Sequence, residues 1–448
     1  MARAARDGVS AGPGAGPGTD PDAGRRAVEA VWRIEAARIV GALARYTGDF
    51  PLAEDVASEA LAEALVAWPR DGVPRDPAAW LLTVGRRRAI DAFRRRSARD
   101  ERYAALAHHL DEGGAWAGAD ATGPGAGAGD DDLLWDPDRI DDDRLALLFV
   151  ACHPVLFKEA RVALTLRVVG GLTSEQVAAA FLVPVPTVQA RITRAKKTLA
   201  AARVPFEVPP AAERAERLGS VLNVLYVIFA EGSTASSGEA WMRADLAQEA
   251  VRLARQLVHL VPEEPEAHGL LALLELTAAR FPARTGPDGA PVLLADQDRR
   301  RWDRAAIRRG RAALARAVGT GRGLGPYGLQ AAIAEQHAVA PSVEETDWER
   351  IVLVYEALGR VAPSPVVEVN RAVAVSMAAG PAAALPLVDA LAAGGQLRGS
   401  YLLPSVRGEL LARLGRDAEA RAELELAARL CGNAQERGVL ERKAAALG

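Results

Sequence analysis

The sequence predicts an all-α protein with three folded parts. Apolar residues recur at helical spacing through most of the chain, and the periodic segments end at Gly, Pro or Asp. At one domain per roughly 100–200 residues, 448 residues correspond to about three domains. We therefore expect helical domains at residues 25–103, 145–203 and 204–448.

The composition limits the kinds of protein that the chain can be. With 50% hydrophobic and 25% charged residues, it has the composition of a soluble globular protein. Its net charge of -3 means that any nucleic-acid contact must come from local basic patches. The sequence contains no run of about 18 apolar residues, the length needed to span a membrane. Residues 1–24, rich in Gly, Pro and Ala, lack the apolar core of a signal peptide. We expect a cytoplasmic protein without membrane contact, and a disordered tail at residues 1–24.

The cysteine, histidine and carboxylate patterns indicate no disulfide, metal site or catalytic site. Cys152 and Cys431 lie far apart within helical patterns, so we expect two buried thiols and no disulfide. His108 and His109 have no third ligand at metal-site spacing. No Ser/His/Asp set or glycine-rich phosphate loop occurs, so we expect no catalytic residues, no metal and no cofactor.

The first domain is expected to hold three helices, at residues 27–46, 52–68 and 76–103. Asp55 and Glu59 share one face of the second helix, with Glu63 a turn further on. Such a stripe is either a solvated face or a docking face for a basic partner helix. The third helix opens with Asp76 as N-cap and a proline after it.

The third helix is strongly cationic and has aromatic neighbours. This combination suits phosphate contacts and stacking on unpaired bases. The residues concerned are Trp80, Arg86, Arg87, Arg88, Phe93, Arg94, Arg95, Arg96, Arg99, Arg102 and Tyr103. Residues 104–144 are rich in Gly, Ala and Asp, which predicts a flexible acidic linker.

Residues 161–202 have the pattern of two helices joined by a tight turn. Thr173 and Gln176 can form a capping box, and that helix should run to Phe181. After a turn at residues 182–185, Pro186 suits the first position of the second helix. The predicted core stripe of that helix consists of Val188, Ile192, Ala195 and Leu199.

The opposite face of this second helix carries polar groups and then cations, which suit base edges and phosphates respectively. This pattern predicts a helix-turn-helix DNA reader, and the alternative is a helical hairpin with a solvated basic face. The outward residues are Thr187, Gln189, Arg191, Thr193, Arg194, Lys196 and Lys197.

Residues 204–448 consist of successive amphipathic segments that suggest a solenoid of helix hairpins. Gly380 and Gly415 lie about one 34-residue tetratricopeptide repeat apart. Ala420, Leu424 and Ala427 fall where packing residues are expected. The charged run DQDRRRWD is either a docking patch or a helix N-terminus with solvated arginines. Its candidate docking residues are Asp296, Asp298, Arg301 and Trp302, with Trp302 packed inward.

In the order of these parts, residues 25–203 resemble a bacterial RNA polymerase sigma factor of the extracytoplasmic-function type. AEDVASEALAEALVAW looks like the region 2 helix that binds the clamp helices of the largest polymerase subunit, which makes Asp55 and Glu59 candidate core-binding residues. AWLLTVGRRRAIDAFRRR looks like the helix that reads and melts the minus-10 element. The residues implied for that role are Trp80, Arg86, Arg87, Arg88, Arg94 and Arg95. Arg87 stands where the family commonly has an asparagine, so the minus-10 preference is not carried over.

Residues 161–199 look like region 4 of the same family, which docks its recognition helix on the minus-35 element. The resemblance places four base-facing positions there, Gln189, Ala190, Thr193 and Arg194. Thr187 and Arg191 are then nearer the DNA backbone. The implied partners are promoter DNA and the polymerase core, through the clamp helices and the flap of the second-largest subunit.

The segments HPVLF, FLVPVPT and LLADQDRRRWDR resemble the sigma-factor subgroup that has a long tetratricopeptide-like C-terminal extension. The resemblance implies promoter-specific transcription initiation without catalysis. The extension is expected either to modulate this activity, with a regulatory protein as a candidate partner of the repeats, or to contact polymerase. The alternative is a helix-turn-helix regulator on a repeat scaffold that acts without polymerase.

Overall fold

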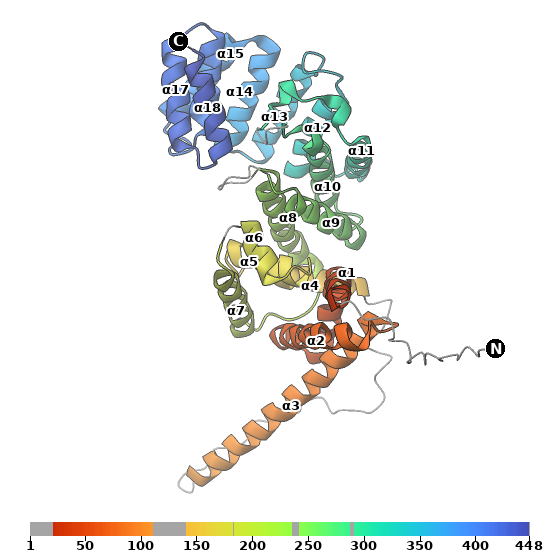
Figure 1. Ribbon diagram of the computed structural model, residues 1–448. Helices are drawn as coiled ribbons and strands as arrows, with labels where there is room; N and C mark the ends of the chain where they lie inside the picture. The colour runs from red at the N-terminus through yellow and green to blue at the C-terminus, as the bar shows by residue number, and fades with distance from the viewer. Residues whose placement is uncertain (1–20, 111–139, 182, 235–241, 287–290, 448) are drawn as a thin grey trace, which may run out of the picture. The chain divides into compact units, whose positions relative to one another are not determined.

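A computed structural model of the protein describes residues 21–110, 140–181, 183–234, 242–286 and 291–447 (Figure 1). Over these ranges the chain is helical, and its β structure is limited to one isolated bridge between Thr285 and Pro291. The prediction of an all-α fold is confirmed. The chain divides into two compact units, one up to Asp143 and the other from Arg144 onward. None of the described helices is long and apolar enough to cross a bilayer.

The first unit is built on three helices, α1 (Pro21–Thr47), α2 (Phe50–Asp71) and α3 (Pro77–Leu110). Carboxylates cap two of them as N-cap residues do. The Asp49 side chain accepts a hydrogen bond from the Leu52 N–H at 3.0 Å, and Asp76 accepts one from the Ala79 N–H at 3.0 Å. The predicted cap at Asp76 is therefore present.

The helices of the first unit pack closely because small residues lie where they meet. Gly85 of α3 lies against Leu43 of α1, and a Cβ at Gly85 would come within 2.7 Å of the Leu43 side chain. Alanines of α2 such as Ala57 and Ala60 are 0% exposed. This packing forms a core with large side chains such as Ile39, which is also 0% exposed.

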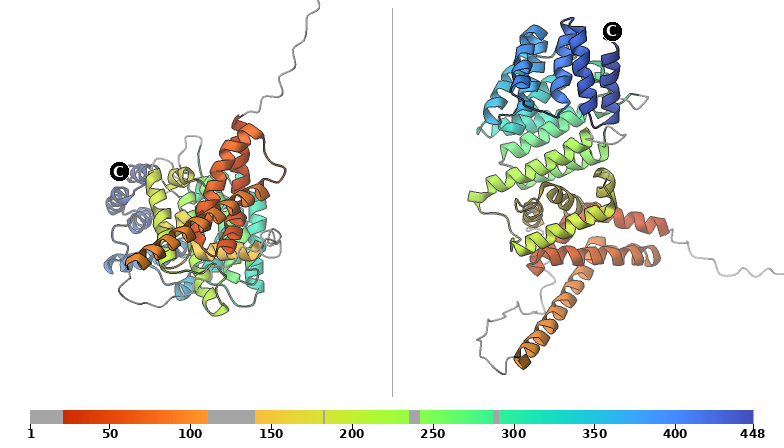
Figure 2. Two further views of the ribbon diagram at one scale, coloured as in Figure 1. Left: turned by 90° about the horizontal axis from the view of Figure 1, so that it is seen from below. Right: turned by 90° about the vertical axis from the view of Figure 1, so that its left-hand side faces the viewer.

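The observed helix ends differ from the predicted boundaries. α1 begins at Pro21, so the last four residues of the predicted tail at 1–24 are helical, and residues 1–20 lie outside the described part. α3 continues to Leu110, since the AALAHHL segment is rich in good helix formers. Figure 2 shows its C-terminal part projecting away from α1 and α2. Of the predicted linker at 104–144, residues 104–110 belong to α3 and α4 begins at Ile140, while residues 111–139 are not described.

The second unit starts within α4 (Ile140–Ala151) and continues with α5 (Lys158–Val168), α6 (Ser174–Phe181) and α7 (Val185–Ala201). The segment at 161–202 thus holds parts of three helices, where the sequence pattern predicted two. The two predicted helices correspond to α6 and α7, and α5 is the additional one. It ends before a Gly-Gly pair, where Gly171 has a φ of 69° that favours glycine.

Stacked helices continue the second unit to its C-terminus (Figure 1). They are α8 (Ala211–Ser233), α9 (Ala244–Leu260), α10 (Pro265–Ala278), η2 (Phe281–Ala283), η3 (Leu294–Asp296), η4 (Arg299–Arg301), α11 (Arg304–Gly319), α12 (Pro326–Val339), α13 (Trp348–Val361), α14 (Pro365–Ala379), α15 (Pro381–Ala393), α16 (Leu402–Arg413), α17 (Asp417–Leu430) and α18 (Ala434–Ala445).

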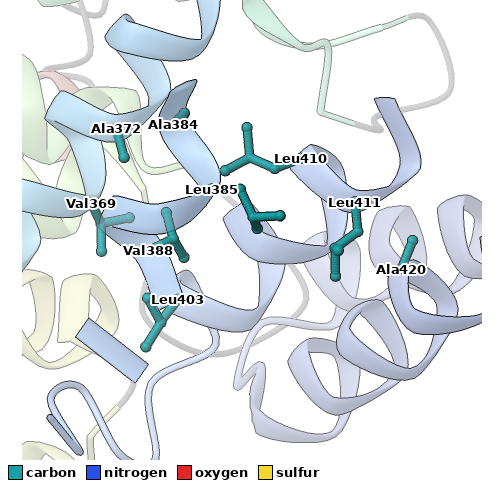
Figure 3. Packing of buried hydrophobic residues seen from close by; sticks show 9 residues of the cluster. All are labelled: Val369, Ala372, Ala384, Leu385, Val388, Leu403, Leu410, Leu411 and Ala420. Carbon is teal, nitrogen blue, oxygen red and sulfur yellow. The ribbon is translucent and has the colours of Figure 1, made fainter. Parts of the chain in front are cut away.

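The last helices include two hairpins, each turning at one of the glycines noted in the sequence. Gly380, with φ 89°, separates α14 from α15, and Gly415, with φ 72°, separates α16 from α17. These two hairpins share one core, to which α14, α15, α16 and α17 all contribute (Figure 3). The predicted packing residues Ala420, Leu424 and Ala427 are at most 1% exposed, so that prediction is confirmed.

Both cysteines are buried and free, as the sequence predicted. Burial raises the pKa of the Cys152 thiol to about 12. Cys152 lies next to Thr165, with 3.3 Å between Sγ and Oγ1. It behaves as a small core residue that stays protonated at neutral pH.

Candidate nucleic-acid interface

The core side of α7 is the stripe that the sequence predicted. Val188, Ile192, Ala195 and Leu199 are the buried residues of this helix. α7 packs against α5 and α6. The rotation of α7 about its axis is therefore fixed, and with it the residues that face outward.

α6 begins with the capping box that the sequence predicted, and α7 begins one residue before its predicted start. Gln176 N–H donates to Thr173 Oγ1 at 3.2 Å, and Thr173 N–H donates to Gln176 Oε1 at 2.9 Å, so the capping box of α6 is confirmed. α7 begins at Val185 with Pro184 as its N-cap, one residue before the predicted start at Pro186. Pro184 has a φ of −60°, which needs no glycine.

The outward side of α7 carries all eight predicted minus-35 residues. Gln189, Ala190, Thr193, Arg194 and Lys197 are exposed, and Thr187, Arg191 and Lys196 are half-buried. Within the described ranges, Arg191, Arg194 and Lys197 form no ion pair; the Arg194 Nε–H donates to the Ala190 carbonyl at 3.2 Å. These three side chains are therefore not engaged by a carboxylate of the described residues.

Two arginines of α3 are held by a carboxylate of α2. Arg87 Nη2 donates to Glu63 Oε1 and Arg88 Nη2 donates to Glu63 Oε2, both at 2.8 Å. Arg88 also lies 3.8 Å from Glu59. The hydrogen bond from Arg88 is the main cause that lowers the pKa of Glu63. The sequence pattern indicated Glu63 only as part of an acidic stripe, and it did not reveal that Glu63 joins the predicted minus-10 residues to the predicted core-binding face.

The other predicted minus-10 residues have varied surroundings. Trp80 is half-buried and meets Trp68 edge to face, with 5.7 Å between ring centroids. The Arg86 guanidinium lies over the Tyr46 ring, 5.6 Å from its centroid. Arg94 and Arg95 are exposed, and so is Arg87 in spite of its hydrogen bond to Glu63.

The predicted core-binding residues lie on the accessible face of α2. Asp55 and Glu59 are both exposed. Glu59 keeps half of its side-chain surface, 51%, in spite of its neighbour Arg88. The structure thus places both carboxylates where a partner can reach them.

The predicted docking residues of the extension are spread over a structural turn. Trp302 is 2% exposed, as expected. Asp298 caps η4 by accepting from the Arg300 N–H at 3.0 Å, and it pairs with the Arg300 side chain. Asp296 and Arg301 are exposed. Asp298 and Trp302 thus have structural roles, one as a helix cap and the other as a core residue.

The join between α4 and α8 was not visible in the sequence. The last carbonyls of a helix lack intrahelical partners. Here α8 supplies them: Ser220 Oγ donates to the Cys152 carbonyl at 2.6 Å, and Arg217 donates to the Phe149 carbonyl at 3.2 Å. Arg161 of α5 in turn donates to Ser220 Oγ at 2.8 Å. The helix-turn-helix and the extension therefore share hydrogen bonds as well as one compact unit.

These features define a class, a helix-turn-helix DNA-binding protein with a separate arginine-rich helical region. Comparisons with known proteins agree. Residues 33–99 match the model of sigma-70 region 2, residues 147–199 match that of sigma-70 region 4, and residues 217–318 match a family of unknown function, DUF6596. No solved structure matches the chain.

Two kinds of relative were found. An uncharacterized protein of Rhizobium meliloti (strain 1021) is 46% identical over 409 residues, which cover 89% of this chain and 90% of that protein. The probable ECF RNA polymerase sigma factor SigI of Mycobacterium tuberculosis is 30% identical over 191 residues, 42% of this chain and 59% of SigI. The chain belongs to the sigma-70 family of RNA polymerase sigma factors, in its extracytoplasmic-function group, and carries a helical C-terminal extension.

Proposed function

We propose that the chain directs RNA polymerase to specific promoters through two DNA-reading surfaces, α7 for the minus-35 element and α3 for the minus-10 element. The observation that carries the proposal is α7, whose buried stripe fixes Gln189, Thr193 and Arg194 outward. An amide side chain suits adenine and a guanidinium suits guanine. Such a factor acts by binding and by capturing unpaired bases, without a catalytic step, and it works in the cytoplasm beside the DNA.

Polymerase contact is proposed for the acidic face of α2. Asp55 and Glu59 are exposed carboxylates one turn apart, and they would meet basic residues of the clamp helices in the largest subunit. The helix-turn-helix would contact the flap of the second-largest subunit.

The extension is proposed to modulate initiation because it is fastened to the DNA-reading region. α8 packs against α5, one of the two helices that α7 packs against, and Ser220 of α8 accepts a hydrogen bond from Arg161 of α5. A regulatory protein bound to the repeats would thereby reach the helix-turn-helix. Asp296, Asp298, Arg301 and Trp302 remain proposed docking residues, although two of them also serve the fold.

Dependence on polymerase tests the proposal. The purified full chain should bind its promoter specifically only when core polymerase is present, which is measured by mobility shift with and without core. Tight, sequence-specific binding by the chain alone would instead indicate a conventional regulator.

The core contact is tested by a charge reversal. We expect Asp55→Arg together with Glu59→Arg to abolish co-purification with core polymerase while the helical circular dichroism spectrum is unchanged. The matched control is Glu35→Arg on α1, another partly exposed carboxylate, which pairs with Arg38 at 3.5 Å. Unchanged co-purification of the double variant would refute the assignment.

A further inference from the structure

Three arginine side chains gather in the connection between α10 and α11. Arg280 and Arg284 flank η2, and Arg299 begins η4. Two of these guanidinium groups share the indole ring of Trp302. The Arg299 Cζ lies 4.6 Å and the Arg280 Cζ 5.9 Å from its centroid. Arg284 lies over the Phe281 ring at 5.8 Å. We call Arg280, Arg284 and Arg299 the arginine cluster.

Several hydrogen-bonding groups of this region are buried without a partner among the described residues. They include Arg280 Nε, Arg299 Nη2, Trp302 Nε1 and His337 Nδ1. The other terminal nitrogen of Arg299, Nη1, donates to the carbonyls of His337 and Ala340 at 2.6 and 2.7 Å. Buried donors are normally satisfied, so the orphaned donors of Arg280, Arg299 and Trp302 call for a missing acceptor.

Two members of the cluster are not held in a close ion pair. Among the described residues, neither Arg280 nor Arg299 forms an ion pair with a carboxylate. Of the nearby acids, Asp298 pairs with Arg300 and Asp303 caps α11 by accepting from two backbone N–H groups. The charges of Glu344 and Glu436 act on Arg299 and Arg284 respectively. A buried charge without a partner is strongly unfavourable in a folded protein.

The electrostatics of the cluster agree with this geometry. Burial, and then the charges of Arg284 and Arg299, lower the pKa of Arg280 to about 10. Burial also lowers the pKa of Arg284 to about 10. Burial and the charges of Arg280 and Arg299 lower the pKa of His337 to about 4, so this imidazole is neutral at pH 7. The arginines remain protonated at that pH, and the charges that act on Arg280 are those of the other two arginines.

We propose that the arginine cluster binds a small phosphate-bearing molecule. Guanidinium groups match phosphate oxygens in pairs of parallel hydrogen bonds. A tetrahedral phosphate offers three oxygens to the three side chains, whereas a carboxylate offers two. The ligand would remove the repulsion between the arginines and accept from their orphaned donors. This inference concerns the extension alone and does not depend on promoter binding.

Anion-dependent stability of the full chain tests the proposal. The thermal midpoint is measured with pyrophosphate, inorganic phosphate, malonate as a carboxylate dianion, and sodium chloride at matched ionic strength. We expect the midpoint to rise by several degrees with pyrophosphate and less with phosphate, because ligand binding to the folded state stabilises it. Malonate should act like chloride.

A pair of arginine variants locates the site. Arg280→Met should bind pyrophosphate about tenfold more weakly or not at all. Its midpoint without ligand should be unchanged or higher, because an unpaired buried charge is removed. The control Arg300→Met removes an exposed arginine of the same segment and should bind as the natural chain does. Arg280→Lys keeps the charge but loses the planar pair of N–H donors. This variant should fold as the natural chain does and bind pyrophosphate more weakly.

Three results would overturn the proposal. One is a midpoint that pyrophosphate raises no more than chloride does. Another is an equal effect of malonate, which would assign the cluster to carboxylates. The third is the same loss of binding in Arg300→Met as in Arg280→Met, which would indicate general charge screening.

Discussion

The two regions that match sigma-70 regions 2 and 4 use their positive charge differently. On α3, Arg87 and Arg88 are already bound to Glu63 of α2. On α7, Arg191, Arg194 and Lys197 form no ion pair within the described residues. The number of arginines in α3 is therefore larger than the number available to DNA. A phosphate would have to displace Glu63 from Arg87 and Arg88. Arg191, Arg194 and Lys197 of the recognition helix have no such competitor in the described part of the chain.

The regions also differ in how they complete their cores. α1, α2 and α3 form a compact unit, while α4 relies on α8 for its C-terminal hydrogen bonds and α5 packs against α8. We expect the largest effect from cutting the chain at Val204. Removing one large buried side chain costs about 2–5 kcal/mol, and loss of α8 removes several of them from this core.

Fragments measure this difference. Residues 1–110 should unfold cooperatively in urea, and residues 140–203 should not, while residues 140–283 should regain a cooperative transition. Circular dichroism at the helical band follows the unfolding. Cooperative unfolding of 140–203 would show that the helix-turn-helix is independent of the extension.

Two substitutions on α7 separate sequence readout from charge. Arg194→Ala should weaken minus-35 recognition by about 1–3 kcal/mol at one base position. Lys197→Ala should lower affinity evenly on all sequences and reduce the salt slope by about 0.9. Both are measured by fluorescence anisotropy of polymerase holoenzyme on promoter variants over a salt series. Equal losses on every DNA sequence would contradict the separation.

Removing the Glu63 carboxylate would release Arg87 and Arg88 of α3. Glu63→Gln should raise affinity for single-stranded DNA several-fold and steepen the salt slope by about 0.7 for each additional phosphate that the arginines neutralise. The expected change in stability is small, about 0–1 kcal/mol, because the pairs are partly exposed. Glu35→Gln, which leaves α3 unaltered, is the control in the same anisotropy assay. No rise in affinity would mean that Arg87 and Arg88 do not meet DNA.

The smallest effect is the pH dependence of the same pairs. Since the pKa of Glu63 is lowered in the folded chain, chiefly by Arg88, its contribution to stability is fully present above the unfolded pKa of about 4.3. That contribution is lost as the pH falls through the lower folded pKa. The carboxyl carbon shift of Glu63 followed by NMR should titrate below its usual range. Titration at or above about 4.3 would contradict the ion pairs.

Local patterns in the sequence predicted most helices and the orientation of α7. The caps at Asp76 and Thr173 depend on residues within three positions, and the stripe from Val188 to Leu199 depends on one helical period. Contacts between distant segments carry no such signature. Glu63 binds arginines 24 and 25 positions away, and Ser220 binds a carbonyl 68 positions away. The arginine cluster likewise emerges only after Arg280 and Arg299 meet at one indole.

The hydrogen bonds from α8 to the end of α4 bear on how this chain can be recombined. A chimera that joins its helix-turn-helix to another protein at residue 203 would discard Arg217 and Ser220 and leave the Phe149 and Cys152 carbonyls without them. An exchangeable DNA-reading module should keep α8. A junction with another protein should therefore lie after α8, within the helical repeats.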